Sequence, residues 1–350
     1  VSDEFYNCGK NLTKEEQDGF KMKIFIPKRN PASHKGSYGK CLIIAGAEGM
    51  AGAAYFAALS AYRTGTGLVK LCSAKENLGI LQTLIPEAII LSAPKIKENF
   101  QELEKAIEWA DFLLFGPGMG TGKEAEDLLR LVLDKGRAPL LIDADGLNLL
   151  SRNSDLQALA KSYGRKSLLF LTPHLMEFSR LSGKSLTEIE NRGGEIAKSF
   201  GKEYHCILLL KSHDTMVISP DGGLVYQRKR SCAALSKGGS GDVFAGSIAG
   251  IYLILEEESK RKAKADLFQT AFPLEGSNEK NSDVVKEDSS VMPIGQGCKA
   301  AILSCEAQIL AGELAAREWG EHGVLAENIA NAMGKALEHL EEQGCWIDQS

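Results

Sequence analysis

The sequence lacks the features that place a protein in a membrane or on a nucleic acid. No apolar run approaches the roughly 20 residues that cross a bilayer. The first 20 residues are polar and have no apolar core of the kind found in signal peptides. The formal net charge is -5, and no basic cluster forms a patch for nucleic acid or membrane lipids. We therefore expect a cytoplasmic protein that binds neither membranes nor nucleic acids.

The sequence also lacks the cysteine spacing of a metal site or a disulfide framework. None of its eight cysteines forms a C-x-x-C pair, and Cys41, Cys72 and Cys206 lie in strand-like apolar runs. Apolar surroundings and a cytoplasmic location favour buried, reduced thiols. The 350 residues contain no internal repeat and are 44% hydrophobic, which is enough to form a large core.

The sequence contains a regular alternation of short apolar runs with helical patterns. Strands are predicted at residues 41–45, 68–72, 112–115, 140–142, 168–171 and 206–210, and helices at residues 53–63, 101–109, 124–133, 175–182 and 186–200. Residues 216–219 and 224–227 predict a hairpin. This order is typical of an α/β protein with a mainly parallel central sheet and helices on both faces.

A single domain accounts for most of the chain. We expect it to cover residues 31–345, after an N-terminal extension at residues 1–30. Residues 256–297 are rich in Glu, Lys, Ser, Asp and Asn, which predicts an exposed polar insertion that is partly disordered. Helices at residues 299–319 and 326–342 are predicted to follow this insertion.

The most informative segment is a glycine-rich loop before an apolar run at residues 243–255. Its residues are Lys237-Gly238-Gly239-Ser240-Gly241-Asp242. Small residues allow a tight turn, and successive N–H groups at a helix start form an anion-binding hollow. A carboxylate at Asp242 can accept a proton from a hydroxyl group during phosphoryl transfer. An ordinary loop before a helix, with Asp242 as a first-turn carboxylate, explains the same residues.

Further loops that carry Gly, Asp or His follow the predicted strands. Ligands in open α/β sheets bind beyond the carboxyl ends of strands, so the convergence of such loops favours a nucleotide-handling enzyme over a structural protein. Besides residues 45–53, these loops are Gly116-Pro117-Gly118-Met119-Gly120, Asp143-Ala144-Asp145-Gly146-Leu147-Asn148, Thr172-Pro173-His174 and Lys211-Ser212-His213-Asp214-Thr215.

Each of these loops also has a purely structural explanation. The segment at residues 116–120 can be a turn that needs positive φ angles. Asp143 and Asp145 can be helix caps, and His174 can be a residue at a helix start. Lys211 can be a solvated lysine at the end of a strand. These explanations stay open for each loop taken alone.

Together, the motifs resemble the ADP- or ATP-dependent NAD(P)H-hydrate dehydratase family, which has the ribokinase-like fold. The resemblance runs from about His34 to the C-terminal helices and includes two more segments, His34-Lys35-Gly36 and Arg63-Thr64-Gly65-Thr66-Gly67-Leu68-Val69. It implies a lyase that repairs (S)-NADH-hydrate or (S)-NADPH-hydrate. ADP or ATP would phosphorylate the C6 hydroxyl group, and loss of phosphate would restore NADH or NADPH. Mg²⁺ is expected because phosphate and carboxylate oxygens suit a hard cation.

The resemblance also implies a role for each site residue. Asp242 would be the catalytic base, and the hydrated cofactor would contact Ala53, Gly118, His174 and Asp242. The residues that bind the nucleotide would be Lys211, Ser212, His213, Asp214, Thr215, Gly239, Ser240 and Gly241, with the last three stabilising the phosphoryl group through their N–H groups. The residues that would support the site or organise Mg²⁺ are Asp143, Asn148 and Glu177, and the metal ligands are left unknown.

The chain departs from the family pattern at three places. Family members often carry Lys-Gly-Ala-Gly-Thr where this chain has residues 211–215, so bulkier side chains and a carboxylate lie where the nucleotide is expected. Met176 replaces a usual Gly, and the insertion at residues 256–297 is longer than expected. Many relatives also carry an N-terminal epimerase domain, which residues 1–30 are too short to supply.

The resemblance further implies a homo-oligomer, a tetramer, with an NAD(P)H-hydrate epimerase as functional partner. Two other functions stay open. A ribokinase-like kinase for a small molecule such as a vitamin precursor would stop at the phosphorylated product. A nucleotide-binding sensor or scaffold would have lost catalysis, although such a protein has no need of a base at Asp242. The loops at residues 116–120 and 172–174 favour the dehydratase over the kinase.

Overall fold

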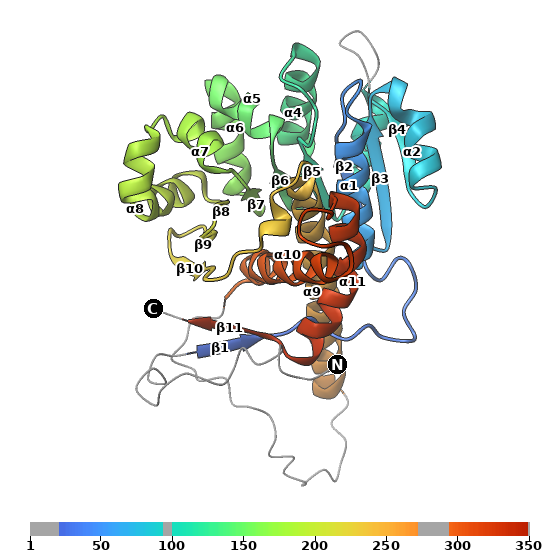
Figure 1. Cartoon of the computed structure of the whole chain (residues 1–350). Helices are drawn as coiled ribbons and strands as arrows, with labels where there is room; N and C mark the ends of the chain where they lie inside the picture. The colour runs from blue at the N-terminus through green and yellow to red at the C-terminus, as the bar shows by residue number, and fades with distance from the viewer. Residues whose placement is uncertain (1–20, 94–99, 272–293, 349–350) are drawn as a thin grey trace, which may run out of the picture.

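A nine-stranded sheet forms the centre of the computed structural model, which describes residues 21–93, 100–271 and 294–348. The strands lie in the order β10-β9-β8-β7-β6-β5-β2-β3-β4, as Figure 1 shows. Strands β2 to β8 are parallel, while β9 and β10 form an antiparallel hairpin at one edge, so the predicted sheet is confirmed. The strand bounds are β2 (Lys40–Ile44), β3 (Leu68–Ser73), β4 (Ile89–Ser92), β5 (Phe112–Phe115), β6 (Leu140–Ile142), β7 (Leu169–Leu171), β8 (Ile207–Leu210), β9 (Met216–Ile218) and β10 (Leu224–Gln227).

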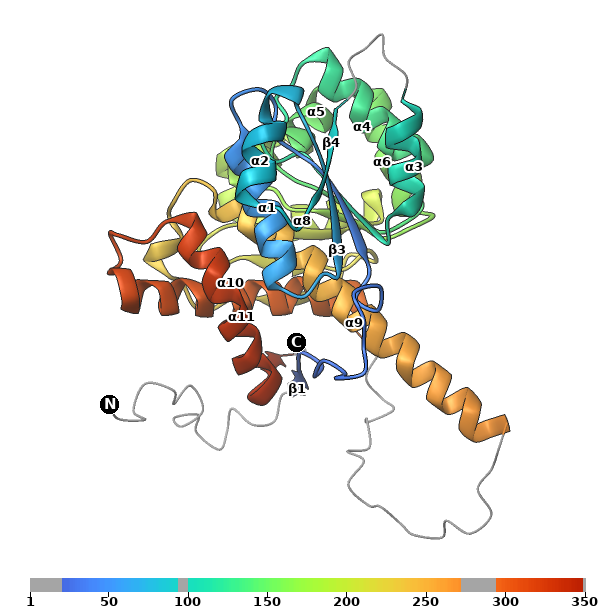
Figure 2. The ribbon, with the colours of Figure 1, turned by 90° about the vertical axis from the view of Figure 1, so that its right-hand side faces the viewer.

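Helices cover both faces of this sheet, as predicted (Figure 2). Alternate strand residues point to opposite faces, so Ile43 packs in one core while Leu42 and Ile44 pack in the other. The first core is covered by α1 (Ala51–Arg63), α2 (Leu78–Leu84), α9 (Ser240–Ala271), α10 (Gln296–Trp319) and α11 (Ala326–Glu342). The second core is covered by α3 (Gln101–Trp109), α4 (Lys123–Lys135), α5 (Asp145–Arg152), α6 (Ser154–Gly164), α7 (Leu175–Ser182) and α8 (Leu186–Tyr204).

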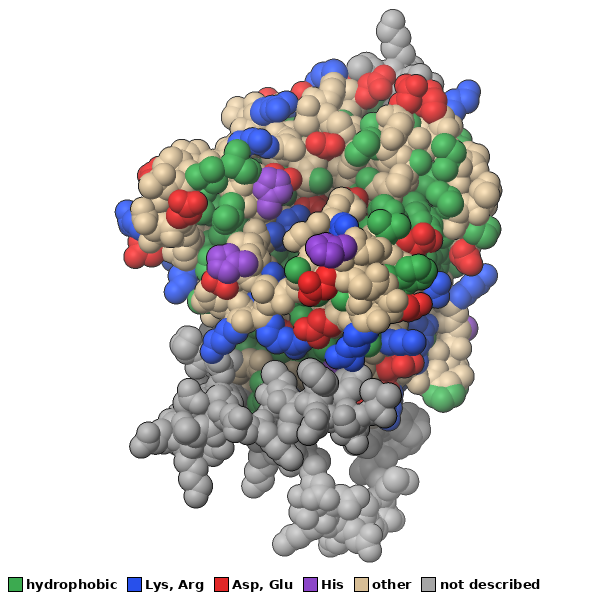
Figure 3. Space-filling model, in the orientation of Figure 1, with side chains coloured by type: hydrophobic (Ala, Val, Ile, Leu, Met, Phe, Trp, Pro, Cys, Tyr) green, Lys and Arg blue, Asp and Glu red, His purple; other side chains and the backbone are tan. Residues whose placement is uncertain are grey.

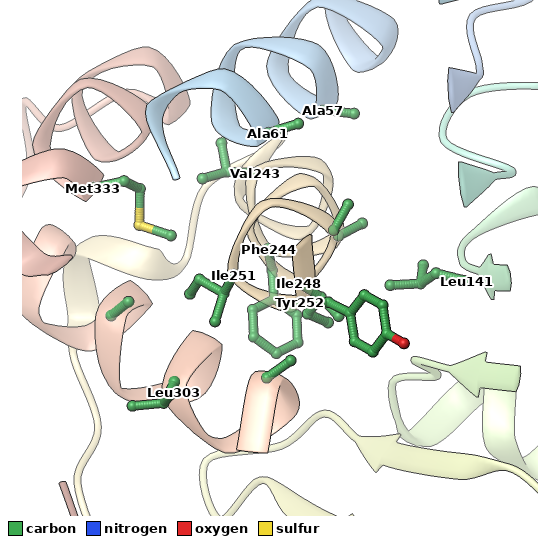
Figure 4. Close-up of a cluster of buried hydrophobic side chains, with 14 of the residues drawn as sticks. Ala57, Ala61, Leu141, Val243, Phe244, Ile248, Ile251, Tyr252, Leu303 and Met333 are labelled. Carbon is green, nitrogen blue, oxygen red and sulfur yellow. The ribbon is translucent and has the colours of Figure 1, made fainter. Parts of the chain in front are cut away.

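Helix α9 passes through the middle of the first core. Figure 4 looks along this helix and shows Val243, Phe244, Ile248, Ile251 and Tyr252 radiating from it toward α1, α10 and the sheet. Because it is apolar on all sides over this part, the helix is buried rather than amphipathic. The apolar run after the glycine-rich loop is therefore a core helix, as the sequence predicts.

Two glycines let α9 lie directly against α1. A Cβ atom on Gly246 would lie 2.1 Å from the carbonyl oxygen of Ala57, and one on Gly250 would lie 2.1 Å from the Thr64 hydroxyl oxygen. Real Cβ atoms cannot approach so closely, so any larger residue would push the two helices apart. The spacing of four residues places both glycines on one face of α9.

The structure corrects the expected bounds of the polar insertion. Helix α9 continues through residues 256–271 and projects from the body of the protein (Figure 2), and α10 begins at Gln296. Ion pairs such as Lys260–Glu256 and Arg261–Glu258 support this helical continuation, which the polar composition alone did not indicate. Residues 272–293 of the expected insertion lie outside the described residues.

The structure also places residues near both ends of the chain in one small sheet. Strand β1 (Lys21–Ile24) pairs with β11 (Cys345–Asp348) in antiparallel register, and Ile24 and Ile26 are buried in the first core. The folded unit therefore includes residues that we expected in the extension at residues 1–30, of which residues 1–20 are not described. No helix in the described ranges is long and apolar enough to span a membrane.

The close contact of α9 with α1 gives a test of the packing. We expect Gly246→Ala to lower the free energy of unfolding by about 1–3 kcal/mol, since the added methyl group overlaps the α1 backbone. Gly194→Ala in α8 is the matched control, because a Cβ atom there meets nothing within 4 Å. That control should stabilise the protein by up to about 1 kcal/mol through helix propensity. Urea unfolding of both variants measures the difference, and equal effects would contradict this account of the packing.

Candidate active site

The sheet has a topological switch point between β2 and β5, where the chain order of the strands reverses. The loops that follow these two strands touch there, since the N–H of Ala47 donates to the carbonyl oxygen of Gly118 at 2.6 Å. A Cβ atom on Gly118 would lie 2.9 Å from the Cβ of Ala53, at the start of α1. The structure therefore brings together Ala53 and Gly118, two of the four residues expected at the hydrated cofactor.

The loop after β5 is also the tight turn that its glycines suggested. Gly116, Gly118 and Gly120 all have positive φ angles. A Cβ atom on Gly116 would lie 2.0 Å from the carbonyl oxygen of Asp143, so this glycine is required by close packing. The turn and the site are thus formed by the same residues.

Asp143, at the end of β6, is held in a hydrogen-bonded chain and is not a helix cap. Its Oδ1 atom accepts from the Thr172 hydroxyl group at 2.7 Å and from the Lys211 ammonium group at 2.7 Å. The N-cap position of α5 is Ala144, which has a positive φ of 50° and makes no capping bond with its side chain. The helix-cap explanation is therefore wrong for Asp143.

Lys211 is not the solvated lysine that one interpretation of the sequence proposed. Its side chain is 22% exposed and its Nζ atom forms an ion pair with Asp143, whose side chain is 2% exposed. Although burial alone lowers the pKa of Lys211, the nearby carboxylates of Asp143, Glu177 and Asp242 raise it above the ordinary value. Lys211 therefore carries a fixed positive charge among three acidic side chains.

The glycine-rich loop packs between α1 and α11. Gly239 has a φ of 89°, and a Cβ atom on it would lie 2.8 Å from both Phe56 of α1 and Ala326 of α11. The Lys237 ammonium group donates to the carbonyl oxygen of His322 at 3.0 Å. Gly241 differs from Gly239, since the nearest atom to an added Cβ is the Lys211 Nζ at 3.9 Å. Space is therefore left beside Gly241, next to the ammonium group.

Asp242 lies in the first turn of α9 and is difficult to ionise. Burial, together with the negative charge of Asp143, raises its pKa to about 7, although Lys211 acts in the opposite direction. A carboxyl group with a pKa near ambient pH is well matched to general-base catalysis. Figure 3 shows acidic, basic and histidine side chains gathered around a hollow on this face of the protein.

His174 has both a structural role and an exposed position. It is the N-cap of α7, where its Nδ1 atom accepts from the N–H groups of Met176 at 3.1 Å and Glu177 at 3.3 Å. Glu177 completes a capping box by accepting from the N–H of His174. The predicted helix-start role is confirmed, while the ring is still 51% exposed. The backbone of His174 also bridges to Lys211, so both lie at one sheet edge.

The segment after β8 forms a closed turn. The Thr215 side chain is buried, and its hydroxyl group donates to the carbonyl oxygen of Ser212 at 2.9 Å. His213 and Asp214 point outward and lie 3.1 Å apart, and the His213 side chain is 82% exposed. Arg228 donates to the carbonyl oxygen of Ser212 at 2.8 Å and supports the turn from behind.

Asn148 lies away from Asp143 and belongs to a neighbouring cluster. Its side chain accepts from Arg180 at 3.0 Å and donates weakly to Asp145 at 3.4 Å. Asp145 also accepts from the N–H of Gly120 at 2.8 Å, so it ties the loop after β5 to the start of α5. No local sequence pattern indicates this role of Asp145.

Comparison with known proteins identifies the family to which this site belongs. The family model described as NAD(P)H-hydrate dehydratase matches residues 41–288. The chain is 34% identical over 232 residues to the ADP-dependent (S)-NAD(P)H-hydrate dehydratase of Listeria monocytogenes. The matched segment covers 66% of this chain and 77% of that protein. The chain belongs to the NAD(P)H-hydrate dehydratase family.

Two solved structures share the fold of this chain. The ADP/ATP-dependent NAD(P)H-hydrate dehydratase of Bacillus subtilis superposes with a TM-score of 0.67 at 22% identity, over 91% of this chain and 95% of that one. A ribokinase-like superfamily protein of Enterococcus faecalis superposes with a TM-score of 0.68 at 23% identity, over 90% of this chain and 92% of that one. The predicted ribokinase-like fold is therefore confirmed.

One relative in the NAD(P)H-hydrate dehydratase family is much longer than this chain. The bifunctional NAD(P)H-hydrate repair enzyme of Moorella thermoacetica is 29% identical over 327 residues, which cover 91% of this chain. The chain spans about half the length of that enzyme, 53% of it.

The sequence alone did not assign Thr172 or Phe56 a role at the site. Thr172 was noted only as part of a motif, yet its hydroxyl group holds the Asp143 carboxylate. Phe56 carries no chemical signal, yet its ring packs where a side chain on Gly239 would lie. Phe56 lies three residues after Ala53, and residues at this spacing lie on the same face of a helix. This spacing was the only feature of the sequence that could have indicated a place for Phe56 at the site.

The raised pKa of Asp242 predicts a pH-dependent stability. Because its folded pKa is about 7 against an ordinary value of 3.8, ionisation costs stability as the pH rises through this interval. Asp242→Asn removes this cost, so its Tm should exceed that of the wild type by about 2 °C or more near pH 8. The difference should be small near pH 4, where the wild-type carboxyl group is protonated in the folded state.

Differential scanning calorimetry across this pH range makes the measurement. Asp214→Asn is the matched control for removal of a carboxylate from the same face, because that side chain is exposed. A Tm difference for Asp242→Asn that does not change with pH would refute the electrostatic explanation.

Proposed function

We propose that this chain catalyses the nucleotide-dependent dehydration of (S)-NADH-hydrate and (S)-NADPH-hydrate to NADH and NADPH. The observation that carries the proposal is Asp242, a base with a pKa of about 7, immediately behind the glycine-rich loop and near the Lys211 ammonium group. Membership of the NAD(P)H-hydrate dehydratase family supports hydrated NADH and NADPH as the substrates. The enzyme is then a hydro-lyase that repairs damaged cofactors.

The reaction needs a base and an anion-binding hollow, and the site supplies both. Asp242 accepts the proton of the C6 hydroxyl group while the hydroxyl oxygen attacks the terminal phosphoryl group of the nucleotide. The bond from that phosphorus to the bridging oxygen breaks, and AMP leaves from ADP or ADP leaves from ATP. The N–H groups at Gly239 and Gly241 and the charge of Lys211 stabilise the phosphoryl group in transfer, whereas the N–H of Ser240, expected to do the same, donates to the carbonyl oxygen of Lys237 at 3.2 Å. Phosphate then leaves with the electrons of the C6–O bond, and a proton leaves C5, so the ring double bond is restored. Hydroxide, a poor leaving group, is thereby replaced by phosphate.

We infer that ADP or ATP is the phosphoryl donor and that it arrives with Mg²⁺. The Listeria relative is named ADP-dependent, and the Bacillus enzyme was crystallised with ATP and Mg²⁺. Within residues 21–93, 100–271 and 294–348, no group of three or more His, Cys, Asp or Glu side chains is placed to hold a metal ion. Asp143 already binds Lys211 and Thr172. Phosphate oxygens would therefore hold Mg²⁺, which neutralises their charge.

The two substrates are assigned to the two sides of Asp242. The hydrated cofactor lies against Ala53 and Gly118, at the switch point of the sheet, and extends to His174, which follows β7. The nucleotide lies over the turn at residues 211–215 and the glycine-rich loop. We also propose a cytoplasmic homo-oligomer, a tetramer, that works with an NAD(P)H-hydrate epimerase, since the hydrate occurs as two epimers.

The direct test is to supply hydrated NADH with ADP or ATP and follow the absorbance of the restored dihydronicotinamide. Asp242→Asn should fold normally, bind nucleotide and lose about 10²–10⁴-fold in kcat, since a positioned base is removed. Activity within a few-fold of the wild type would refute the role of Asp242. Accumulation of a phosphorylated product, without free phosphate, would indicate the small-molecule kinase instead.

The position of His174 predicts a separable effect on the hydrated cofactor. His174→Asn keeps an acceptor for the α7 N-terminus, so stability should be preserved. The KM for the hydrate should rise about tenfold if one ordinary hydrogen bond is lost, while the KM for the nucleotide stays unchanged.

His174→Ala is the matched control, because it removes the cap as well and should destabilise the fold by about 1 kcal/mol. Steady-state kinetics and urea unfolding of the two variants separate binding from capping. A rise in the nucleotide KM, with the hydrate KM unchanged, would reverse the assignment of the two sides.

A further inference from the structure

Three consecutive parallel strands contribute one residue each to a hydrogen-bonded chain. Asp143 follows β6, Thr172 follows β7 and Lys211 follows β8. The Thr172 hydroxyl group and the Lys211 ammonium group both donate to the same Asp143 oxygen at 2.7 Å. Thr172 is fully buried, and the Asp143 side chain is nearly so. Residues 68 positions apart in sequence thus meet at the centre of the site.

The backbone of Lys211 is fixed as firmly as its side chain. Its N–H donates to the carbonyl oxygen of Pro173 at 2.8 Å, which continues the parallel pairing of β7 and β8 beyond their ends. The ammonium group then points toward α9, where a Cβ atom on Gly241 would lie 3.9 Å from it. Both ends of this long side chain are therefore held.

Stability alone does not explain such an arrangement. A buried ion pair gains little over apolar packing, because both charges lose their hydration. If Asp143 did not hold Lys211, its ammonium group could pair with Asp242 instead, because the charge of Asp242 is close enough to raise the pKa of Lys211. A direct Lys211–Asp242 pair would stabilise the carboxylate and weaken it as a base.

We propose that Asp143 and Thr172 are positioning residues that act through Lys211, holding its ammonium group beside Gly241 and paired with Asp143 rather than with Asp242. This inference rests on the proposed phosphoryl transfer. In that reaction the ammonium group lies where negative charge develops on the phosphoryl oxygens. Thr172 fixes the rotamer of Asp143, and Asp143 fixes the ammonium group before the nucleotide binds. Preorganised charges of this kind need no rearrangement during the reaction.

The charges that face Asp242 support the same conclusion. They are Asp143 after β6, Asp145 at the start of α5 and Lys211 after β8. Glu177 of α7 also faces Lys211. Asp143 repels the Asp242 carboxylate and also holds the Lys211 ammonium group, the cation that faces Asp242. Loss of the Asp143 charge therefore removes the repulsion and at the same time releases Lys211. Both changes make Asp242 easier to ionise.

The test compares Thr172→Val, Thr172→Ser and Asp143→Asn in the intact enzyme. Thr172→Val removes the hydroxyl group at nearly constant volume and should lower kcat about tenfold, with the KM for the hydrate within twofold of the wild type. Thr172→Ser restores the hydroxyl group and should restore kcat. Asp143→Asn should lower kcat about 10–100-fold and shift the rising limb of the kcat/KM pH profile to lower pH. A purely structural role would lower the Tm without moving this limb.

A measurement independent of activity keeps the two proposals distinguishable. An amine-acylating reagent, followed by mass spectrometry, should modify Lys211 faster in Thr172→Val and Asp143→Asn than in the wild type. Lys237 is the internal control, because its ammonium group is held by the carbonyl oxygen of His322 and not by Asp143. Unchanged labelling of Lys211 together with an unchanged kcat would overturn the positioning role. If Lys211 is modified more slowly in the wild type than in the two variants, but the wild type produces no NADH from hydrated NADH, only the proposed function is overturned.

Discussion

The site depends on the close approach of α1 and α9, which Gly246 and Gly250 make possible. Gly246 and Gly250 allow α9 to lie on the backbone of α1, and this fixes where α9 begins. Helix α1 in turn carries Ala53, which faces the loop after β5, and Phe56, which faces the glycine-rich loop. The two loops that approach the two substrates are therefore positioned by a single helix. A shift of α9 by the width of a methyl group would separate Asp242 from the rest of the site.

Electrostatics then determine what Asp242 can do in that place. The first turn of a helix favours a carboxylate, yet burial and Asp143 oppose its ionisation more strongly. The result is a pKa of about 7, several units above that of an exposed aspartate. Glu177 follows the same pattern, because burial raises its pKa while Lys211 lowers it. The partly buried Lys211 cation thus offsets negative charge in an acidic site that would otherwise repel the two anionic substrates that we propose.

Local patterns in the sequence predict most of the strands and many of the helices. They miss the helices α2, α5 and α6, and they miss the strands that rely on distant contacts. Alternating apolar runs located β2, β3 and β5 to β10, and the polar residues at strand ends located the site. Strand β4 was missed because it is an edge strand with exposed side chains, and β1 and β11 were missed because they pair across the whole chain. Polar composition wrongly ended α9 at residue 256, since ion pairs between successive turns maintain a solvent-exposed helix.

Within the site, the sequence predicted which residues gather but not how they pair. Residue types and strand ends placed Asp143, His174 and Lys211 at one edge of the sheet. No local pattern connects Asp143 with Lys211, or shows that the buried Thr172 hydroxyl group holds them. The capping box of α7 was predictable in principle, because His174 and Glu177 have the required spacing of three. Its consequence, that one ring nitrogen of His174 is already occupied, follows only from the structure.

The turn after β8 forms without a glycine. Relatives often place glycine where this chain has Ser212 and Asp214, yet neither residue is among the described residues with positive φ angles. The turn is closed by the buried Thr215 hydroxyl group, so its backbone path does not require glycine. The added side chains of His213 and Asp214 point to solvent and lie next to each other. The bulkier side chains in the segment that we propose for the nucleotide are therefore accommodated at the surface, beside each other.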